Sequence, residues 1–285
     1  MSLFQAIVLG VIQGVAELFP ISSTAHTLLI STLFGWTPPS LPFVAMLHLG
    51  TFLAVLIYFA RDFWEILSGA ITGFGDRWSK PNERLALLVV VGTLPLAVIG
   101  YLLEKRLDPL YGRPLVAAVG LMITGLVLFV VERLPQGKAD AEQLSWGNAF
   151  WIGLSQIAGL VPGGSRSGFS IAAGLLAGLS REQAARFSFL LAGPAILGAS
   201  LFELRRIVHP HPGAALHGFV SASAAPEPTL IIAAGFAAAL ISGIFAIRFF
   251  MRYVDQHRLT PFAIYCWVFG AAMIVLLLAR GQAAV

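Results

Sequence analysis

Long runs of apolar residues dominate the chain. Six of these runs are long enough to cross a bilayer, and they lie at residues 43–60, 85–103, 115–131, 185–204, 229–251 and 261–279. A transmembrane helix needs about 20 apolar residues to cross a hydrocarbon core of about 30 Å. The pattern therefore predicts an all-α polytopic membrane protein with about six transmembrane helices.

Two further apolar segments, residues 3–34 and 149–178, are interrupted by "FPISSTAH" and "VPGGSRSGFS". The helical halves on either side would have about 12 to 15 residues, too few to cross the bilayer. Irregular backbone at membrane depth is tolerated where protein covers it or where it lines a wet cavity. We therefore expect two re-entrant helix-turn-helix hairpins. The alternative for each segment is a full span kinked at its proline.

Glycines recur in the two halves of the chain at a constant offset of 143 residues. The matched pairs are Gly10 and Gly153, Gly35 and Gly178, Gly50 and Gly193, Gly92 and Gly235, and Gly100 and Gly243. The offset indicates one membrane domain, 1–285, built from two repeats of about 1–132 and 149–285. Each repeat would contain one hairpin and three spans. Because three is odd, the second repeat should be inverted, an arrangement that brings broken helices together near the membrane midplane.

Composition supports the membrane assignment and limits the partners. Hydrophobic residues make up 58% of the chain and charged residues 11%, with a net charge of +4, whereas soluble domains average about 25% charged residues. The single cysteine, Cys266, excludes a disulfide framework within the chain. No groove of basic and aromatic residues suggests a nucleic-acid partner, and nothing in the sequence indicates an oligomeric state. The first ten residues lack Lys and Arg, so no signal peptide is expected.

Lysines and arginines are distributed unevenly between the two sides. Ten belong to the side formed by loops 61–84, 133–148 and 252–260 and by the 181–186 stretch, against six on the opposite side. Cytoplasmic loops carry the excess of positive charge in membrane proteins. The first side is therefore expected in the cytoplasm and both termini outside.

The first broken segment concentrates reactive side chains. Glu17 is the only formally charged side chain in the first 60 residues, and Gln13, four residues earlier, shares its helix face. The hydroxyl residues after Pro20 are Ser22, Ser23 and Thr24. They can cap a new half-helix, whose free N–H groups form an anion site. Ser22 and Ser23 precede His26 by four and three residues, so at least one should reach its imidazole.

The second broken segment offers a phosphate-binding pattern. Gly163 and Gly164 permit a tight turn with exposed backbone, after which Ser165, Arg166 and Ser167 open a half-helix. A guanidinium binds phosphate oxygens bidentately and stays protonated. Arg166 is the only charged side chain between Glu142 and Arg181. Ionisable groups inside a membrane are costly, so they indicate function by default.

Together these groups favour phosphoryl transfer on a lipid substrate. Glu17 would repel a phosphate unless a divalent cation such as Mg²⁺ bridged them, and His26 supplies a base beside a candidate nucleophile. Structural roles are the alternative. Glu17 and Arg166 could neutralise one another, the hydroxyls could bond to backbone carbonyls, and His26 could be a packed core residue.

The motifs resemble those of a known family. "QGVAELFPISSTAH" and "PGGSRSGFS" resemble the two signatures of the undecaprenyl-pyrophosphate phosphatase family, also called the bacitracin-resistance family, and the likeness extends to "FSFLLAGPAILGA" and "TPFAIYCWVFG". It covers essentially the whole chain. The resemblance implies hydrolysis of undecaprenyl diphosphate to undecaprenyl phosphate and inorganic phosphate, which recycles the lipid carrier of peptidoglycan synthesis. It also implies a multi-pass protein of the bacterial cytoplasmic membrane, a site open to its outer face, and bacitracin as a competitor for the substrate.

By this resemblance, Gln13 and Glu17 would hold the divalent cation, Mg²⁺ or Ca²⁺. Ser23, His26, Glu17 and Arg166 would be catalytic, with Ser23 attacking phosphorus or orienting a water and His26 acting as base. The substrate-binding set would be Ser22, Thr24, Gly163, Gly164, Ser165, Ser167 and Ser170. Three residues depart from the family pattern: Gln13 replaces a common Glu, Ser170 replaces Thr, and His48 replaces a common Gln.

Two other functions use similar features. A transporter or flippase for polyprenyl phosphate would also have inverted repeats with broken helices, and a general lipid phosphatase would act on shorter substrates. The stretch 207–228 carries His209, His211 and His217. They could bind metal, but a surface loop without metal is the expectation.

Overall fold

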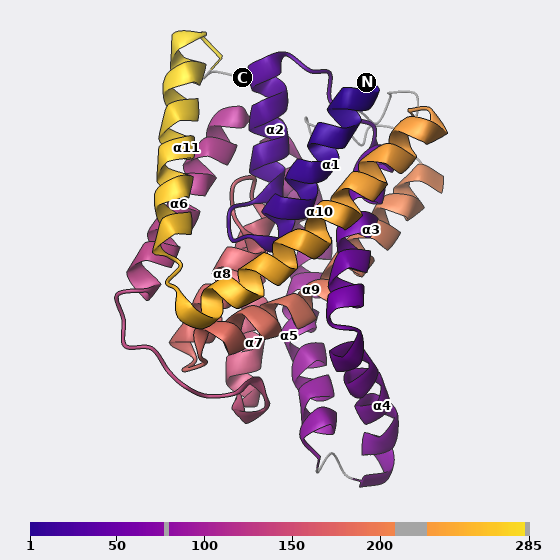
Figure 1. Cartoon of the computed structure of the whole chain (residues 1–285), viewed down its shortest axis with the longest axis vertical. Coiled ribbons are helices and arrows are strands. Elements are labelled where there is room, and N and C mark those ends of the chain that lie inside the picture. Colours follow the sequence, from indigo (N-terminus) through magenta and orange to yellow (C-terminus); the bar gives the residue numbers. More distant parts are fainter. Residues whose placement is uncertain (77–79, 209–226, 283–285) are drawn as a thin grey trace.

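The computed structural model describes residues 1–76, 80–208 and 227–282, and these residues are almost entirely helical (Figure 1). The helices are α1 (Leu3–Leu18), α2 (Ser23–Phe34), α3 (Leu41–Tyr58), α4 (Ala60–Asp76), α5 (Pro81–Leu107), α6 (Pro114–Val131), α7 (Trp146–Ser155), α8 (Arg166–Leu176), α9 (Arg181–Val208), α10 (Thr229–Gln256) and α11 (Thr260–Ala279). The three short 3₁₀ helices are η1 (Asp108–Leu110), η2 (Ala141–Gln143) and η3 (Gln156–Leu160). Within the described ranges, β structure is limited to one bridge between Ala139 and Leu179.

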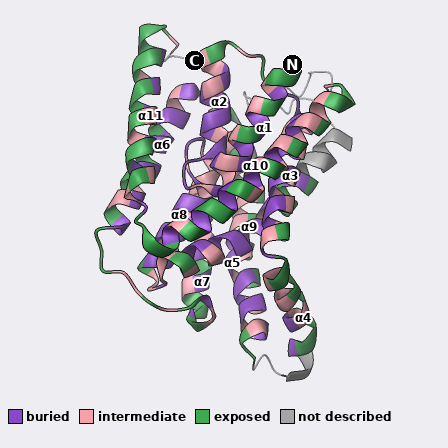
Figure 2. Cartoon of the chain, in the orientation of Figure 1, coloured by how far each residue is buried: buried purple, intermediate pink, exposed green. Residues whose placement is uncertain are grey.

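The six predicted transmembrane helices are confirmed. In the described part of the chain, six helices are long and apolar enough to cross a membrane, and each overlaps one of the predicted spans. These stretches are Leu41–Tyr58, Pro81–Leu103, Pro114–Val131, Arg181–Leu201, Thr229–Gln256 and Thr260–Ala279. Many large apolar side chains on their outer sides are exposed (Figure 2). A water-soluble monomer rarely exposes so much apolar surface, whereas lipid tails cover it in a bilayer.

Both interrupted segments form helical hairpins. α1 and α2 have 16 and 12 residues, and α7 and α8 have 10 and 11, so none is long enough for an untilted span. Each pair turns back on itself near the middle of the molecule (Figure 1). The two turns meet there, where the Ser167 hydroxyl donates to the Phe19 carbonyl over 3.1 Å. Entry of each hairpin into the bilayer from a single side stays a prediction.

Helix caps explain why the hairpins turn where they do. α1 ends two residues before Pro20, whose ring cannot continue the helix. Ser22 caps α2, with its hydroxyl accepting from the Ala25 amide over 3.4 Å. Ser165 caps α8 and accepts from the Gly168 amide over 3.1 Å. The serines in both motifs therefore define the start of the second helix of each hairpin.

Glycine pairs at the 143-residue offset occupy matching places in the fold. Gly35 ends α2 and Gly178 follows α8, and both have a positive φ, 63° and 92°. A Cβ on Gly10 of α1 would clash with the Gly235 carbonyl of α10. In the same way, a Cβ on Gly153 of α7 would clash with the Gly92 carbonyl of α5. The first helix of each hairpin therefore packs closely against a long helix from the other half of the chain.

The expectation that residues 61–84 form a loop is wrong, because α4 occupies most of that stretch. α4 packs against the beginning of α5 and extends below the helical body (Figure 1). Charged residues, Arg61, Asp62 and Glu65, lie near its start. However, Trp64, Leu67 and Ile71 recur at helical spacing. An amphipathic helix has a low average hydropathy, so a search for uniformly apolar runs misses it.

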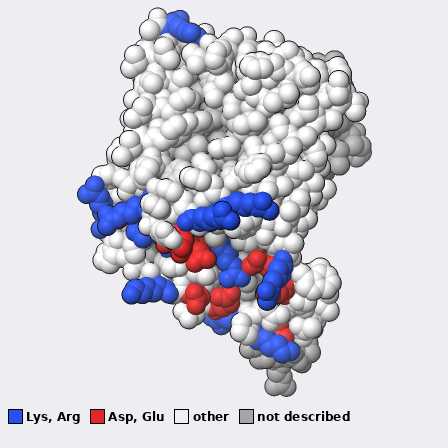
Figure 3. Space-filling model, viewed as in Figure 1, with Lys and Arg blue, Asp and Glu red and all other residues white. Residues whose placement is uncertain are grey.

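Most visible charges gather at the end of the molecule that carries α4 (Figure 3). There Glu132, at the end of α6, binds Arg181 of α9 with an Nη2–Oε2 distance of 2.8 Å. Glu132 also accepts from the Leu259 amide over 2.9 Å. Its side chain is 1% exposed. Glu132 therefore ties together the ends of α6 and α9 and the connection between α10 and α11.

Candidate active site

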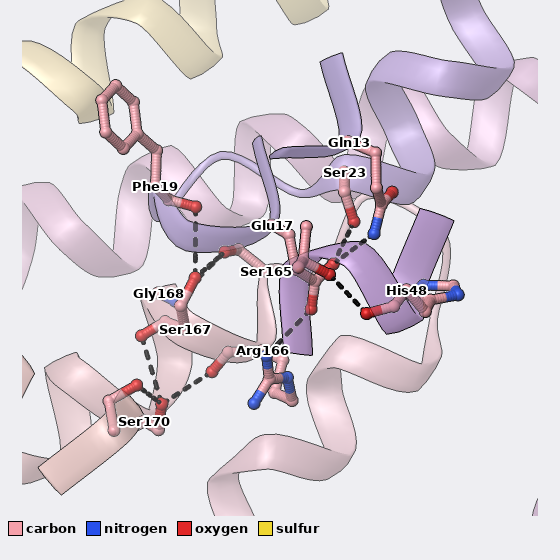
Figure 4. Close-up of polar contacts among 12 residues, drawn as sticks. Gln13, Glu17, Phe19, Ser23, His48, Ser165, Arg166, Ser167, Gly168 and Ser170 are labelled. Carbon is pink, nitrogen blue, oxygen red and sulfur yellow. Dashed lines mark hydrogen bonds and ion pairs between the residues drawn. The ribbon is translucent and has the colours of Figure 1, made fainter. Parts of the chain in front are cut away.

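The two hairpin turns bring Glu17 and Arg166 into direct contact (Figure 4). Arg166 Nη2 donates to Glu17 Oε1 over 2.8 Å, and the two side chains are 14% and 12% exposed. The other carboxylate oxygen, Oε2, accepts from the Ser23 hydroxyl over 2.5 Å and from Gln13 Nε2 over 3.4 Å. The structure therefore gathers Gln13, Glu17, Ser23 and Arg166 around one carboxylate.

Helix polarity disfavours each charge of this pair on its own. Glu17 lies in the last turn of α1, and Arg166 is the first residue of α8. The partial charge at a helix C-terminus disfavours a carboxylate, and that at an N-terminus disfavours a cation. Direct contact offsets both penalties, and it also spares each group from being buried alone.

The glycine-rich turn before α8 is held by hydroxyl groups. Thr124 of α6 donates to the Gly163 carbonyl over 2.9 Å and accepts from the Ser165 amide over 3.2 Å. Gly163 has a φ of 88°, in the region where glycine is favoured. Thr124 was not among the sequence-predicted residues. Its contacts are long-range, and local sequence gives no signal for them.

A cavity of about 480 Å³ contains this cluster. Nine of the twelve predicted site residues line it: Gln13, Glu17, Ser22, Ser23, Thr24, Gly164, Ser165, Arg166 and Ser167. The remaining three, His26, Gly163 and Ser170, do not. The Ser170 hydroxyl is turned to the Arg166 carbonyl at 2.8 Å and to Ser188 at 2.6 Å, so it supports α8 from behind.

The expected contact between His26 and a serine hydroxyl is not formed. His26 Nδ1 lies 2.8 Å from the Ser22 carbonyl, and Nε2 lies 2.7 Å from the Tyr265 hydroxyl of α11. The ring also stacks on Phe269 with 4.7 Å between centroids. Ser23 instead donates to Glu17. The carboxylate, and not the imidazole, is therefore placed to receive the Ser23 proton.

The cavity divides into a polar and an apolar part. The Glu17–Arg166 cluster forms the polar part. Apolar residues from several helices form the rest, among them Leu9, Val44, Leu47, Leu96, Leu160 and Ile196. Pro39, Leu107 and Tyr111 carry the lining toward the end of the molecule opposite α4. This shape suits a ligand with an anionic head and an apolar tail.

Several polar residues in the lining have no role predicted from the sequence, and two of them lie close to predicted features. His48 of α3 lies beside Glu17 in the close-up (Figure 4), and it had been noted only as a departure from the family pattern. Gln156 of η3 is fully buried and donates from Nε2 to the Gly92 carbonyl over 3.1 Å. Gln156 lies 143 residues after Gln13, so the repeat offset was the available signal for it.

The cavity offers few side chains that could bind a metal cation. Glu17 is the sole carboxylate among the described residues that line the cavity. No group of three His, Cys, Asp or Glu side chains in the described ranges could hold a metal. Mg²⁺ keeps several waters and often uses one or two carboxylates together with substrate phosphates. Glu17 and Gln13 therefore fit a cation that arrives with a phosphate ligand. His209, His211 and His217 lie outside the described residues.

Comparison with known proteins shows which family the chain is similar to. The family described as bacitracin resistance protein BacA matches residues 6–272. An undecaprenyl-diphosphatase of Acidiphilium cryptum is 40% identical over 282 residues, covering 95% of this chain and 97% of the relative. Undecaprenyl-diphosphatase 2 of Burkholderia ambifaria is 38% identical over 278 residues, covering 95% of both chains. An undecaprenyl-diphosphatase of Rubrobacter xylanophilus is 38% identical over 282 residues, covering 98% and 99%. The chain therefore belongs to the family of bacitracin resistance protein BacA.

Proposed function

We propose that this multi-pass membrane protein hydrolyses undecaprenyl diphosphate to undecaprenyl phosphate and inorganic phosphate. The observation that carries the proposal is the Glu17–Arg166–Ser23 cluster in a mostly apolar cavity. The names of the relatives, undecaprenyl-diphosphatase, support the same reaction. The product would return the lipid carrier to the synthesis of peptidoglycan and other envelope polymers.

Arg166 is the group that would hold the terminal phosphate. Nη2 is bonded to Glu17, but Nη1 is buried and has no hydrogen-bond partner. A buried donor without an acceptor is costly, and a phosphate oxygen would satisfy it. The neighbouring hydroxyls of Ser165 and Ser167 lie 3.2 Å apart at the start of α8. The Ser167 hydroxyl donates to the Phe19 carbonyl, so it would have to turn to bind this anion, whereas the N-terminus of α8 supplies backbone amide donors.

Glu17 would take the proton in the chemical step. In the covalent route, Ser23 Oγ forms a bond to the terminal phosphorus, and its proton passes to Glu17. The bridging P–O bond breaks and undecaprenyl phosphate leaves. Water then cleaves the phosphoserine and releases phosphate. In the direct route, the same two residues orient and deprotonate a water that attacks phosphorus. Both routes assign to Glu17 the base role that the sequence suggested for His26.

A divalent cation, Mg²⁺ or Ca²⁺, belongs to the proposal as a companion of the substrate. Glu17 and Gln13 are the residues that would hold it. When bound, the cation would supply positive charge against the diphosphate oxygens. The cation would share with Arg166 the neutralisation of the Glu17 carboxylate. Arg166 would then keep Nη1 for the terminal phosphate.

The orientation proposed is that of a cytoplasmic-membrane enzyme whose site opens outward. The α4 end carries most of the visible Lys and Arg side chains (Figure 3), and cytoplasmic loops are enriched in these residues. The cavity lining extends toward the opposite end through Pro39, Leu107 and Tyr111. Bacitracin, acting outside the cell, would compete for the same lipid diphosphate.

The architecture proposed is an inverted repeat of about residues 1–132 and 149–285. Three of the five offset glycine pairs support it. Gly35 and Gly178 both have a positive φ at the end of a helix. In the other two pairs, Gly10 packs on Gly235 as Gly153 packs on Gly92. The pair Gln13 and Gln156, both in the cavity wall, follows the same offset. Such repeats place a binding site at their interface, and residues from both proposed repeats line this cavity.

A phosphate-release assay on detergent-solubilised protein tests the proposal. Undecaprenyl diphosphate should yield phosphate without any membrane to cross, and EDTA should stop the reaction. A polyprenyl-phosphate flippase would release none in detergent, but would move lipid phosphate in proteoliposomes. Comparing prenyl diphosphates of different chain lengths with phosphatidyl substrates distinguishes a general lipid phosphatase. Absence of release from every diphosphate would refute the proposed function.

A further inference from the structure

The turn that carries Ser23 has an unusual backbone. Ser22 has φ 65° and ψ 100°, and among the described residues it is the one non-glycine with a positive φ. L-residues with side chains avoid this region unless surrounding contacts hold them there. Such strain is often found where a catalytic group must be aimed. The contacts that hold Ser22 therefore bear on where the Ser23 hydroxyl points.

His26 is the side chain that holds the Ser22 carbonyl. Nδ1 lies 2.8 Å from that oxygen. Because a carbonyl only accepts hydrogen bonds, Nδ1 must carry the proton. In a neutral imidazole, Nε2 is then an acceptor, and the Tyr265 hydroxyl 2.7 Å away donates to it. Both ring nitrogens are thereby occupied.

The surroundings of the imidazole suit a neutral, fixed ring. His26 is 4% exposed and is stacked almost parallel to Phe269 and Tyr265, with interplanar angles of 6° and 8°. Its two polar partners, a carbonyl and a hydroxyl, bring no negative charge to balance an imidazolium. The cavity lining contains Ser22 and Ser23 but neither His26 nor Tyr265. The pair therefore lies behind the cavity wall.

We propose that His26 and Tyr265 form a positioning relay, in which Tyr265 orients His26 and His26 holds the Ser22 carbonyl so that Ser23 meets Glu17. The inference rests on the proposed phosphatase function and adds Tyr265, 239 residues from His26, to the groups on which that reaction depends. Neither residue exchanges a proton with the substrate in this scheme.

Two substitutions separate this role from that of a base. Tyr265→Phe removes the hydroxyl and keeps the stacked ring. Loss of one hydrogen bond should lower kcat about three- to tenfold, with KM changed less than about twofold. His26→Asn keeps a short amide donor for the Ser22 carbonyl but cannot act as a base. It should therefore retain at least about tenfold more activity than His26→Ala.

Controls and pH profiles complete the experiment. Tyr253→Phe, which removes a hydroxyl donating to the Arg258 carbonyl over 3.2 Å on α10, should leave kcat unchanged. The pH dependence of kcat in His26→Asn should keep the shape of the wild-type profile. The relay is overturned if Tyr265→Phe matches wild type, if His26→Asn is as inactive as His26→Ala, or if His26→Asn loses a limb of the profile.

A spectroscopic measurement is independent of turnover. ¹⁵N shifts of labelled histidine, with the His26 signal identified from the His26→Asn spectrum, should show the Nδ1-protonated tautomer in the wild-type protein. A charged ring or an Nε2-protonated tautomer would contradict the relay. If wild-type protein released no phosphate at all, the proposed function would fail, while this measurement would still decide the hydrogen bonding of His26.

Discussion

Glu17 and Arg166 are 149 residues apart in the chain and 2.8 Å apart in the structure, where they join the tips of two hairpins. The ion pair is compatible with both roles that the sequence left open for these residues, mutual neutralisation and function. It neutralises two charges that would otherwise be buried alone, and it leaves Arg166 Nη1 without a hydrogen-bond partner. In the proposed reaction, the ion pair keeps Glu17 and Arg166 neutralised by one another until a diphosphate binds.

Breaking this pair should destabilise the protein. Glu17→Gln leaves the Arg166 cation without its carboxylate, which should cost about 3 kcal/mol and lower the Tm in detergent. Glu17→Gln combined with Arg166→Gln should recover much of the Tm but no phosphatase activity. The exposed pair Arg61 and Glu65 is the control, and neutralising both should leave the Tm unchanged. A Glu17→Gln variant as stable as wild type would contradict this account.

Ser23→Ala should lower kcat by more than about a thousandfold, because it removes the group bonded to Glu17. Ser31→Ala is the matched control, since Ser31 is also buried in α2 but its hydroxyl has no partner. Rapid quenching with labelled substrate separates the two routes. A phosphoenzyme present in wild type and absent in Ser23→Ala indicates covalent catalysis. Full turnover with no trapped intermediate indicates direct attack by water.

Gly153→Ala should lower stability by about 1–3 kcal/mol, because the added Cβ clashes with the Gly92 backbone. Gly147→Ala on the same helix is the control. A Cβ there meets only the Ser145 hydroxyl at 3.9 Å, and alanine favours the helix by about 1 kcal/mol. Thermal unfolding followed by tryptophan fluorescence measures both. Equal Tm values for the two variants would show that α7 does not pack closely on α5.

Glu132→Gln should reduce stability without affecting the chemistry of folded molecules. Glu132 holds Arg181 and the Leu259 amide, and its loss as a charge should cost about 3 kcal/mol. It does not line the cavity, so kcat per folded molecule should stay at the wild-type value. The measurement is Tm alongside active-site-normalised kcat. A fall in kcat at unchanged Tm would place Glu132 in the reaction instead.

Gln13→Glu should raise the affinity of the site for a divalent cation. In the wild-type protein, Gln13 Nε2 lies 3.4 Å from Glu17 Oε2. The substitution places a second carboxylate beside Glu17 and so adds negative charge that attracts the cation. The Mg²⁺ or Ca²⁺ concentration that gives half-maximal activity after EDTA treatment should fall about tenfold. Gln143→Glu in η2, far along the chain and exposed, is the control. An unchanged cation requirement would remove Gln13 from the cation site.

Local pattern was enough for the helices and for most of the site residues. Apolar runs identify the six spans, and proline followed by serine identifies where each hairpin turns, because hydropathy and capping depend on neighbouring residues. The same reasoning failed for α4, whose alternating polar and apolar faces average to a loop-like hydropathy. Gln156 could have been found from the 143-residue offset that relates it to Gln13.

The sequence by itself determined the membrane class, the broken hairpins and the residue types of the candidate site, since each is encoded by a short stretch. Only the tertiary structure decided which of those residues meet. It paired Glu17 with Arg166, gave Ser23 a carboxylate partner in place of His26, and turned His26 toward Tyr265. The physical reason is that two of these contacts join residues 149 and 239 positions apart, and the third, between Ser23 and Glu17, crosses the turn between α1 and α2. Helix packing, and not sequence spacing, sets the distances between them.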